Sequence, residues 1–304
     1  MSKVKEVIRR VLHQFPYIGR MARELKEYKG NSYVPPGHFY SPVISLPEIM
    51  NREAEIFNQE VQTLAGINLN GEEQFNLLTE FKQYYSQLPF KQSIEPSHRY
   101  YYENKYFTYA DAVFLYSLVR KFKPQRIVEI GSGFSSAALL DINDLFFEKR
   151  IRLTFIEPFP INRLAKLLRA NDDYVLVEKF LQDVELGYFE QLQENDILFI
   201  DSSHVVKTGG EVNYLLFEVL PSLKPGVLIH FHDIFYPFEY PKEWILEKRS
   251  WNETYFIRAF LMHNSHYQII TFNSYLQQFH RPWLEANMPF CLKDKGSGLW
   301  LMKR

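Results

Sequence analysis

The sequence predicts a doubly wound α/β fold with a mainly parallel, seven-stranded sheet and an N-terminal helical extension. From about residue 108 onward, short apolar runs rich in β-branched residues alternate with helical stretches. These runs are apolar at nearly every position, which is typical of parallel strands covered by helices on both faces. The length of 304 residues suits one large α/β unit with an appended segment.

Residues 1–104 are predicted to form a mostly helical cap. Residues 1–29 contain eight Lys or Arg and three Glu. Apolar residues recur there at helical spacing, namely Val4, Val7, Ile8, Val11 and Leu12. Such a basic amphipathic helix packs on its own domain or on a partner subunit, or it contacts a membrane surface or an anionic polymer. Residues 47–65 and 72–87 return to helical periodicity, and the aromatic turn 35–42 suits a lid over a bound cofactor.

Residues 105–304 are predicted to form the main domain. Its five predicted parallel strands are residues 126–130, 152–156, 174–177, 196–200 and 226–231. The predicted helices between them are residues 134–148, 160–170, 184–193 and 210–222. Two further strands, residues 266–272 and 298–303, are expected to form an antiparallel edge pair. In such a sheet, ligands bind at the carboxyl ends of the strands, so the functional residues are expected there.

Composition and charge exclude several classes of protein. Hydrophobic residues make up 46% of the chain and charged residues 23%, which is typical of an ordinary globular protein. The formal net charge of −1 provides no overall field that would attract nucleic acid. A single cysteine, Cys291, excludes an internal disulfide framework and fits a reducing, cytoplasmic compartment. No secretory signal and no apolar stretch of transmembrane length is expected.

The first predicted strand runs directly into a helix through 128-VEIGSGFSS-136. Gly131 and Gly133 permit a tight turn and the close approach of a ligand, and the helix N-terminus supplies free N–H groups. Glu129 places a carboxylate there that suits a positively charged ligand and would repel a pyrophosphate. The second strand ends in Glu157, where α/β nucleotide sites use an acid to accept hydrogen bonds from ribose hydroxyls.

The segment VEIGSG, followed by Glu157, resembles the motif of Rossmann-like methyltransferases that bind S-adenosylmethionine (SAM), with Ser135 in place of a third glycine. The resemblance spans about residues 105–272 and implies a Rossmann-like methyltransferase sheet with SAM as its cofactor. The positions that it implies for SAM binding are Glu129, Gly131, Ser132, Gly133, Ser135, Ser136, Glu157 and Asp201. Asp183 follows the third strand, where related enzymes contact the adenine, although a helix N-cap role fits its position equally well.

The fourth strand closes as 197-ILFIDSSH-204 and the fifth as 227-VLIHFHDIF-235. Both segments resemble the O-methyltransferases that act on sugars in macrolide and aminocoumarin biosynthesis, and their cephalosporin-hydroxylase-like relatives. In that group, acids after these two strands hold a divalent metal and a nearby histidine is the general base. The resemblance therefore implies His204 as the base, and Asp201, His232 and Asp233 as ligands of a Mg²⁺ or Mn²⁺ ion. His232 departs from the pattern, because the group has an acid there.

Each of these residues also has a plainer interpretation. His204 could simply stabilise the loop after the fourth strand, Asp201 could contact SAM without any metal, and His230 is expected to be structural. The aromatic run 235–241, after the fifth strand, is expected to line the acceptor pocket.

These features favour a SAM-dependent O-methyltransferase that acts on a hydroxyl of a saccharide or a related secondary metabolite. A catalytically silent SAM-binding subunit and an NAD(P)-dependent oxidoreductase are the alternatives, and Ser136 weakens the second because a dinucleotide fingerprint has Gly or Ala at that position. The expected partners are a small-molecule or saccharide acceptor and further copies of the chain in a homo-oligomer, without nucleic acid.

Overall fold

The structure is a computed structural model that describes residues 16–58 and 60–304. The amphipathic pattern predicted at residues 4–12 lies outside the described residues. The chain divides into two compact units, and each is described by itself below. The smaller unit comprises residues up to Ile56 together with Glu243–Ser250, and the larger comprises Phe57–Lys242 and Trp251–Arg304.

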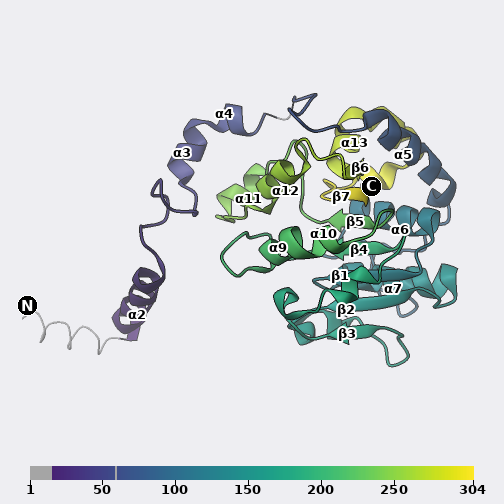
Figure 1. The fold of residues 1–304 in the computed structure, drawn as a ribbon, viewed down its shortest axis with the longest axis horizontal. Helices are drawn as coiled ribbons and strands as arrows, with labels where there is room; N and C mark the ends of the chain where they lie inside the picture. Colours follow the sequence, from purple (N-terminus) through teal and green to yellow (C-terminus); the bar gives the residue numbers. More distant parts are fainter. Residues whose placement is uncertain (1–15, 59) are drawn as a thin grey trace, which may run out of the picture. The chain divides into compact units, whose positions relative to one another are not determined.

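The larger unit is built on a seven-stranded sheet with the strand order β3-β2-β1-β4-β5-β7-β6 (Figure 1). Its strands are β1 (Arg126–Ile130), β2 (Arg152–Ile156), β3 (Val175–Val177), β4 (Ile197–Ile200), β5 (Leu228–Phe231), β6 (Tyr267–Phe272) and β7 (Leu299–Lys303). Strands β1 to β5 pair in parallel. All seven strands coincide with predicted ones to within two residues, so the doubly wound, mainly parallel sheet is confirmed.

The two C-terminal strands pair antiparallel with one another, as expected. They take the last two positions of the sheet, so the expected antiparallel edge pair is formed. Strand β7 also pairs antiparallel with β5 and therefore lies inside the sheet, so that β6 alone forms this edge. Only β7 runs against the direction of the other strands.

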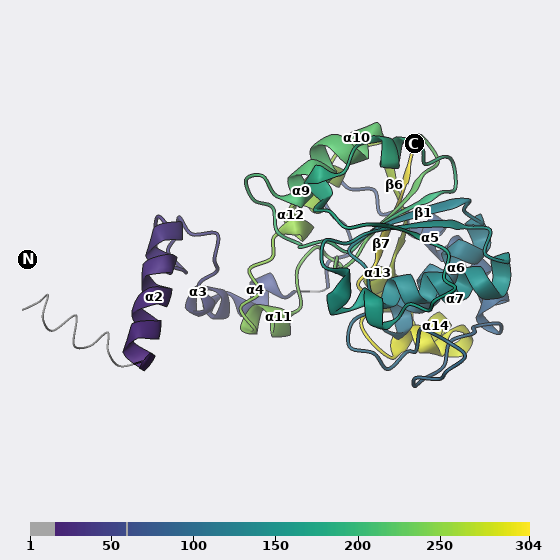
Figure 2. The same ribbon diagram turned by 90° about the horizontal axis from the view of Figure 1, so that it is seen from below.

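Helices cover both faces of the sheet (Figure 2). One apolar cluster contains residues of α5 (Gly71–Tyr85), α6 (Tyr109–Phe122), α7 (Phe134–Phe147), α13 (Asn273–Phe279) and α14 (Arg281–Asn287). The other cluster contains residues of α9 (Glu211–Tyr214), α10 (Leu220–Ser222), α12 (Glu253–Leu261) and the π-helical turn Leu215–Val219 that joins α9 to α10. Along β1, Ile127 packs in the first cluster and Val128 in the second, because successive side chains of a strand point to opposite faces.

Several predicted helices are shorter in the structure. Residues 160–170 form only two 3-10 turns, Pro160–Asn162 and Leu164–Lys166. Between these turns Arg163 has a φ of −135°, and its guanidinium lies 3.7 Å from the ring centroid of Tyr106. This tertiary contact overrides the local helical pattern.

The remaining short segments are single-turn or two-turn helices and 3-10 turns. Residues 184–193 keep a single helix, α8 (Gly187–Glu190), after the 3-10 turn Leu181–Asp183. The 3-10 turn Pro289–Leu292 precedes β7. The prediction over residues 47–65 corresponds to α3 (Leu46–Asn51) and α4 (Glu53–Ile56) only.

The smaller unit contains α2 (Pro16–Asn31), α3, α4 and most of α11 (Lys242–Leu246). The boundary between the units falls after residue 56, whereas the sequence predicted it after residue 104. Helix α5 explains the difference, because Leu78 and Phe81 are fully buried in the same cluster as α6. The turn 35–42 belongs to the smaller unit, and its lid role stays a prediction. Within residues 16–58 and 60–304, no helix is both long and apolar enough to cross a membrane.

Candidate active site

The turn after β1 is held together by Glu129, which the sequence placed near the ligand. Its two carboxyl oxygens accept hydrogen bonds from the hydroxyls of Ser135 and Ser136, each at 2.5 Å. Burial raises the pKa of Glu129 to about 8, although both hydrogen bonds oppose the shift. Because Glu129 is fully buried and does not line the neighbouring cavity, its carboxyl group fixes the turn and the start of α7.

Gly131 is required by the geometry of this turn. Its φ is +76°, and a Cβ atom there would overlap the carbonyl oxygen of Asp201. The backbone of Gly131 donates to Ile156 O at 3.0 Å, and Asp201 N donates to Ile130 O at 2.8 Å. The ends of β1, β2 and β4 are therefore in direct contact at one edge of the sheet, as the fold predicts.

Glu157 links the end of β2 to the glycine turn. Its carboxylate accepts hydrogen bonds from Ser132 N at 3.1 Å and from Phe159 N at 2.8 Å. Glu157 lines the adjoining cavity, so it remains available to a ligand there.

A cavity of about 350 Å³ opens at the carboxyl ends of these strands. Its walls include Gly131, Glu157, Asp201 and Ser202. Among the described residues, the buried hydroxyl of Ser202 has no hydrogen-bond partner, and the same is true of Ser132 in the turn beside the cavity. A polar ligand would satisfy these hydroxyls, and the volume lies in the range of ~300–1,000 Å³ that is usual for small-molecule pockets. The site therefore fits the SAM implied by the sequence.

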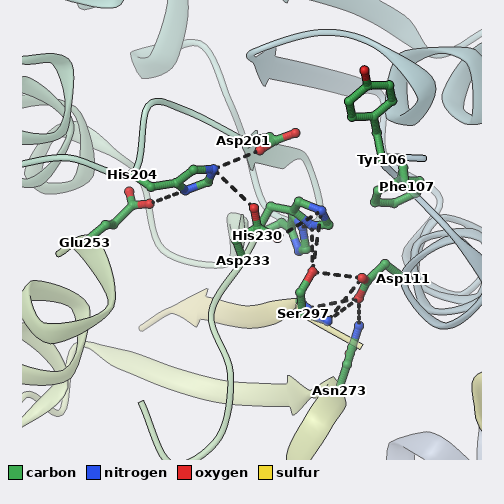
Figure 3. Close-up of polar contacts among 12 residues, drawn as sticks. Tyr106, Phe107, Asp111, Asp201, His204, His230, Asp233, Glu253, Asn273 and Ser297 are labelled. Atoms are coloured by element: carbon green, nitrogen blue, oxygen red, sulfur yellow. Dashed lines mark hydrogen bonds and ion pairs between the residues drawn. The ribbon is translucent and has the colours of Figure 1, made fainter. Parts of the chain in front are cut away.

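Figure 3 shows three ionisable side chains that converge beside this cavity. His204 Nε2 lies 3.4 Å from Asp201 Oδ1 and 3.4 Å from Asp233 Oδ2. One donor atom from each residue lies within 4.8 Å of the others, which is a spacing that could hold a metal ion. His204 and Asp233 have φ values of 59° and 58°. Left-handed backbone at non-glycine residues is strained and is common at functional sites.

The charges of this cluster are strongly coupled. Burial lowers the pKa of His204, but hydrogen bonds with Asp201 and Glu253 and the charge of Asp233 outweigh it and hold the pKa well above its usual value. Burial also raises the pKa of Asp233 above its usual value, although His232 and His204 oppose the shift. Three carboxylates thus surround one imidazole, and such a group attracts a cation.

His232 is turned away from the centre of this cluster. Its Nε2 lies 3.6 Å from Asp233 Oδ1, and its Nδ1 lies 3.4 Å from both His230 Nε2 and Ser297 Oγ. Ser297 in turn donates to the buried Asp111 at 2.9 Å. His204 rather than His232 therefore joins Asp201 and Asp233 in the group with metal-site spacing.

His230 and the aromatic run 235–241 contribute to the core. His230 is buried, and its ring centroid lies 4.0 Å from that of Phe199. Both observations fit the structural role that was predicted for His230. The expectation that residues 235–241 line the acceptor pocket is wrong for most of the run. Tyr236 and Phe238 are each 1% exposed and pack in the cluster that contains α12.

Asp183 is exposed at the end of the 3-10 turn Leu181–Asp183. Its neighbours Leu181 and Gln182 line the cavity, whereas Asp183 does not.

Glu253 and Trp251 follow the aromatic run that the sequence assigned to the acceptor pocket, but their contact with His204 was not predicted. Glu253 Oε2 lies 2.9 Å from His204 Nδ1, and the Trp251 ring centroid lies 4.4 Å from that of His204 (Figure 3 draws the Glu253 contact). Both residues follow His204 by more than forty positions. No local spacing pattern reports such a contact, because it depends on where α12 packs.

The chain is similar to several known proteins. Residues 128–234 match the model of a family described as a methyltransferase domain. An uncharacterised protein of Archaeoglobus fulgidus is 37% identical over 166 residues, which are 54% of this chain and 75% of that protein. Among solved structures, a methyltransferase from Podospora anserina bound to S-adenosylhomocysteine (SAH) is 14% identical with a TM-score of 0.43, over 80% of this chain and 100% of that one. The O-methyltransferase TomG from Streptomyces achromogenes, in complex with SAM, is 14% identical with a TM-score of 0.38, over 84% and 95%.

Proposed function

Because the chain belongs to the Rossmann-like, SAM-dependent methyltransferases, with its methyltransferase domain at residues 128–234, we propose that it transfers a methyl group from SAM to a hydroxyl of a saccharide or a related secondary metabolite. Asp201 carries this proposal, because it belongs to two sites at once. It lines the cavity beside the glycine turn, and it lies 3.4 Å from His204 in the acidic cluster. A cofactor bound in the cavity and the imidazole of His204 would therefore both lie beside Asp201.

The cavity residues would hold the cofactor. SAM, when bound, supplies an electrophilic methyl group: an acceptor oxygen would attack the methyl carbon in line with the C–S bond, SAH would leave, and the acceptor proton would pass to a base. Glu157 would accept hydrogen bonds from the ribose hydroxyls, and the backbone of the turn at Gly131 would lie against the ligand. The unpartnered hydroxyls of Ser132 and Ser202 offer two further polar contacts.

The cluster supports oxygen as the atom that is methylated. An alcohol is a poor nucleophile at neutral pH, so the protein must take up its proton or lower its pKa. In the neutral ring, Nε2 of His204 is placed for the first task, between Asp201 and Asp233, and the raised pKa makes this nitrogen a stronger proton acceptor in that form. A divalent cation held by these two carboxylates and His204 would supply positive charge beside the acceptor oxygen, which is the second route.

The surroundings of His204 support a saccharide as acceptor. The ring centroid of Trp251 lies 4.4 Å from that of His204, and the carboxylates of Asp201 and Asp233 each lie 3.4 Å from Nε2 of the same imidazole. Aromatic faces beside carboxylates are typical of carbohydrate sites.

Calorimetric titration with SAM tests the cofactor site. Glu157→Ala should weaken SAM binding by about 1.5–3 kcal/mol, roughly 10- to 150-fold, which is the range for a hydrogen bond to a charged group. Glu185→Ala removes an exposed carboxylate outside the cavity and should leave the affinity unchanged. Equal affinity of wild type and Glu157→Ala would contradict the cofactor assignment.

Transfer of labelled methyl groups from SAM to a panel of saccharides and polyhydroxylated metabolites tests the reaction. His204→Ala should lower kcat by at least about 10²-fold while SAM affinity stays the same. Loss of activity in EDTA, with recovery on adding Mg²⁺ or Mn²⁺, would identify the cluster as a metal site. Activity that survives EDTA but still needs His204 would identify a metal-free base. SAM binding without transfer to any acceptor would contradict the proposed reaction.

A further inference from the structure

Glu253 is the first residue of α12 and is 1% exposed, yet it carries a carboxylate. One oxygen, Oε2, lies 2.9 Å from His204 Nδ1. The other, Oε1, has no hydrogen-bond partner among the described residues. A buried carboxylate is costly unless it is paired, and among the described residues the hydrogen-bond partner of this side chain is the imidazole of His204.

The backbone around Glu253 also holds the loop of His204. The amides of Asn252 and Glu253 both donate to the carbonyl oxygen of His204, each at 3.1 Å. The side chain of Asn252 accepts from Val206 N at 2.7 Å. The start of α12 therefore fixes the main chain of the His204 loop and, through Glu253, the ring itself.

The two nitrogens of His204 face different groups. Nδ1 faces Glu253, whereas Nε2 faces the space between Asp201 and Asp233 (Figure 3). In a neutral imidazole, one nitrogen carries the proton and the other presents a lone pair, and the hydrogen bond made by one decides the role of the other. Carboxylates only accept, and they face both nitrogens. The contact of Nδ1 with Glu253 is 2.9 Å, whereas Nε2 lies 3.4 Å from each aspartate, so the shorter hydrogen bond favours the form with the proton on Nδ1.

We propose that Glu253 is a positioning residue that holds the ring proton on Nδ1 of His204 and so directs the lone pair of Nε2 between Asp201 and Asp233. This inference rests on the proposed function of that site. Either role of Nε2 requires the lone pair, because proton uptake and metal binding both use it. Residues far apart in the sequence thus form one carboxylate–histidine unit.

Nitrogen NMR of protein labelled with ¹⁵N-histidine tests the proposal without any acceptor. A spectrum of His204→Gln identifies the His204 signals by difference, and the form is read at a pH where the ring is neutral. We expect the wild type to carry the proton on Nδ1. Glu253→Leu should lose this preference, and Glu253→Gln, whose amide oxygen can still accept from Nδ1, should largely restore it.

Glu239→Leu is the matched control, since Glu239 accepts from the Tyr255 hydroxyl at 2.6 Å and, within the described part of the chain, makes no hydrogen bond or ion pair with His204. It should leave the His204 signals unchanged. Titration with SAH separates the proposal from the proposed function, because Glu253→Leu should change SAH affinity by less than about twofold while the ring proton moves. A neutral wild-type ring protonated on Nε2, or an unchanged ring in Glu253→Leu, would overturn the inference even in an active methyltransferase.

Discussion

At Glu129, a carboxyl group is buried beneath the glycine turn with a pKa of about 8, whereas its ordinary value is 4.5. Between these two values, the folded protein keeps a proton that the unfolded chain has lost. The contribution of this group to the free energy of unfolding is therefore full below about pH 4.5. It then falls by up to about 1.4 kcal/mol per pH unit until the folded group ionises near pH 8.

Glu129→Gln tests this balance, because glutamine keeps the shape and the acceptor oxygen but cannot ionise. We expect the melting temperature of Glu129→Gln to rise relative to that of the wild type between pH 5 and pH 8, measured by thermal unfolding at several pH values. Glu178→Gln changes an exposed carboxylate, so its melting temperature should match that of the wild type at every pH. If the melting temperatures of Glu129→Gln and the wild type change with pH in parallel, the buried carboxyl group is already ionised in the folded protein.

Prediction of single residues from the sequence succeeded where the chemistry is local. Gly131 was identified from the turn pattern, and its positive φ beside Asp201 explains why a side chain is excluded. His204 and Asp201 are three positions apart and do meet. The contact of His204 with Glu253 was not predictable, because it joins residues that are 49 positions apart and depends on the packing of α12.

Helix α5 belongs to the core of the methyltransferase unit, although the sequence assigned it to the cap. Phe81 is fully buried, and its ring meets that of Phe114 in α6 edge to face at 6.0 Å. Phe81→Ala should therefore lower the free energy of unfolding by about 3–5 kcal/mol, measured by denaturant unfolding. Lys82→Ala, on the exposed side of the same helix, should change it by less than about 0.5 kcal/mol. A small change in the free energy of unfolding on Phe81→Ala would mean that α5 does not contribute to the stability of the core.

Among the secondary-structure elements, strands were predicted better than helices. The central strands β1, β4 and β5 are short, mainly apolar runs that are buried at nearly every position, so their pattern does not depend on the details of packing. The predicted 160–170 helix is interrupted at Arg163, whose backbone is not helical and whose guanidinium packs over the ring of Tyr106. Tertiary contacts of this kind leave no periodic signal in the sequence.

The two apolar clusters of the whole molecule begin at Leu64 and Leu78, and none of their members lies in residues 16–56. A chain of residues 57–304 should therefore fold, with a melting temperature within about 3 °C of the full chain, the shift that ~1 kcal/mol produces in a domain of this size. Deleting residues 1–90 instead removes α5 and should abolish cooperative unfolding. Failure of the 57–304 chain to fold would show that the smaller unit is needed for stability.

The position of β7 also determines when this molecule can fold during synthesis. Strand β7 fills the place between β5 and β6, but the ribosome makes it after both of them. Until residue 303 has left the exit tunnel, β5 has an open edge and β6 has no neighbouring strand in the sheet. An unfinished sheet of this kind exposes strand edges that can pair with other chains, so we expect the nascent protein to be prone to aggregation until β7 has joined the sheet.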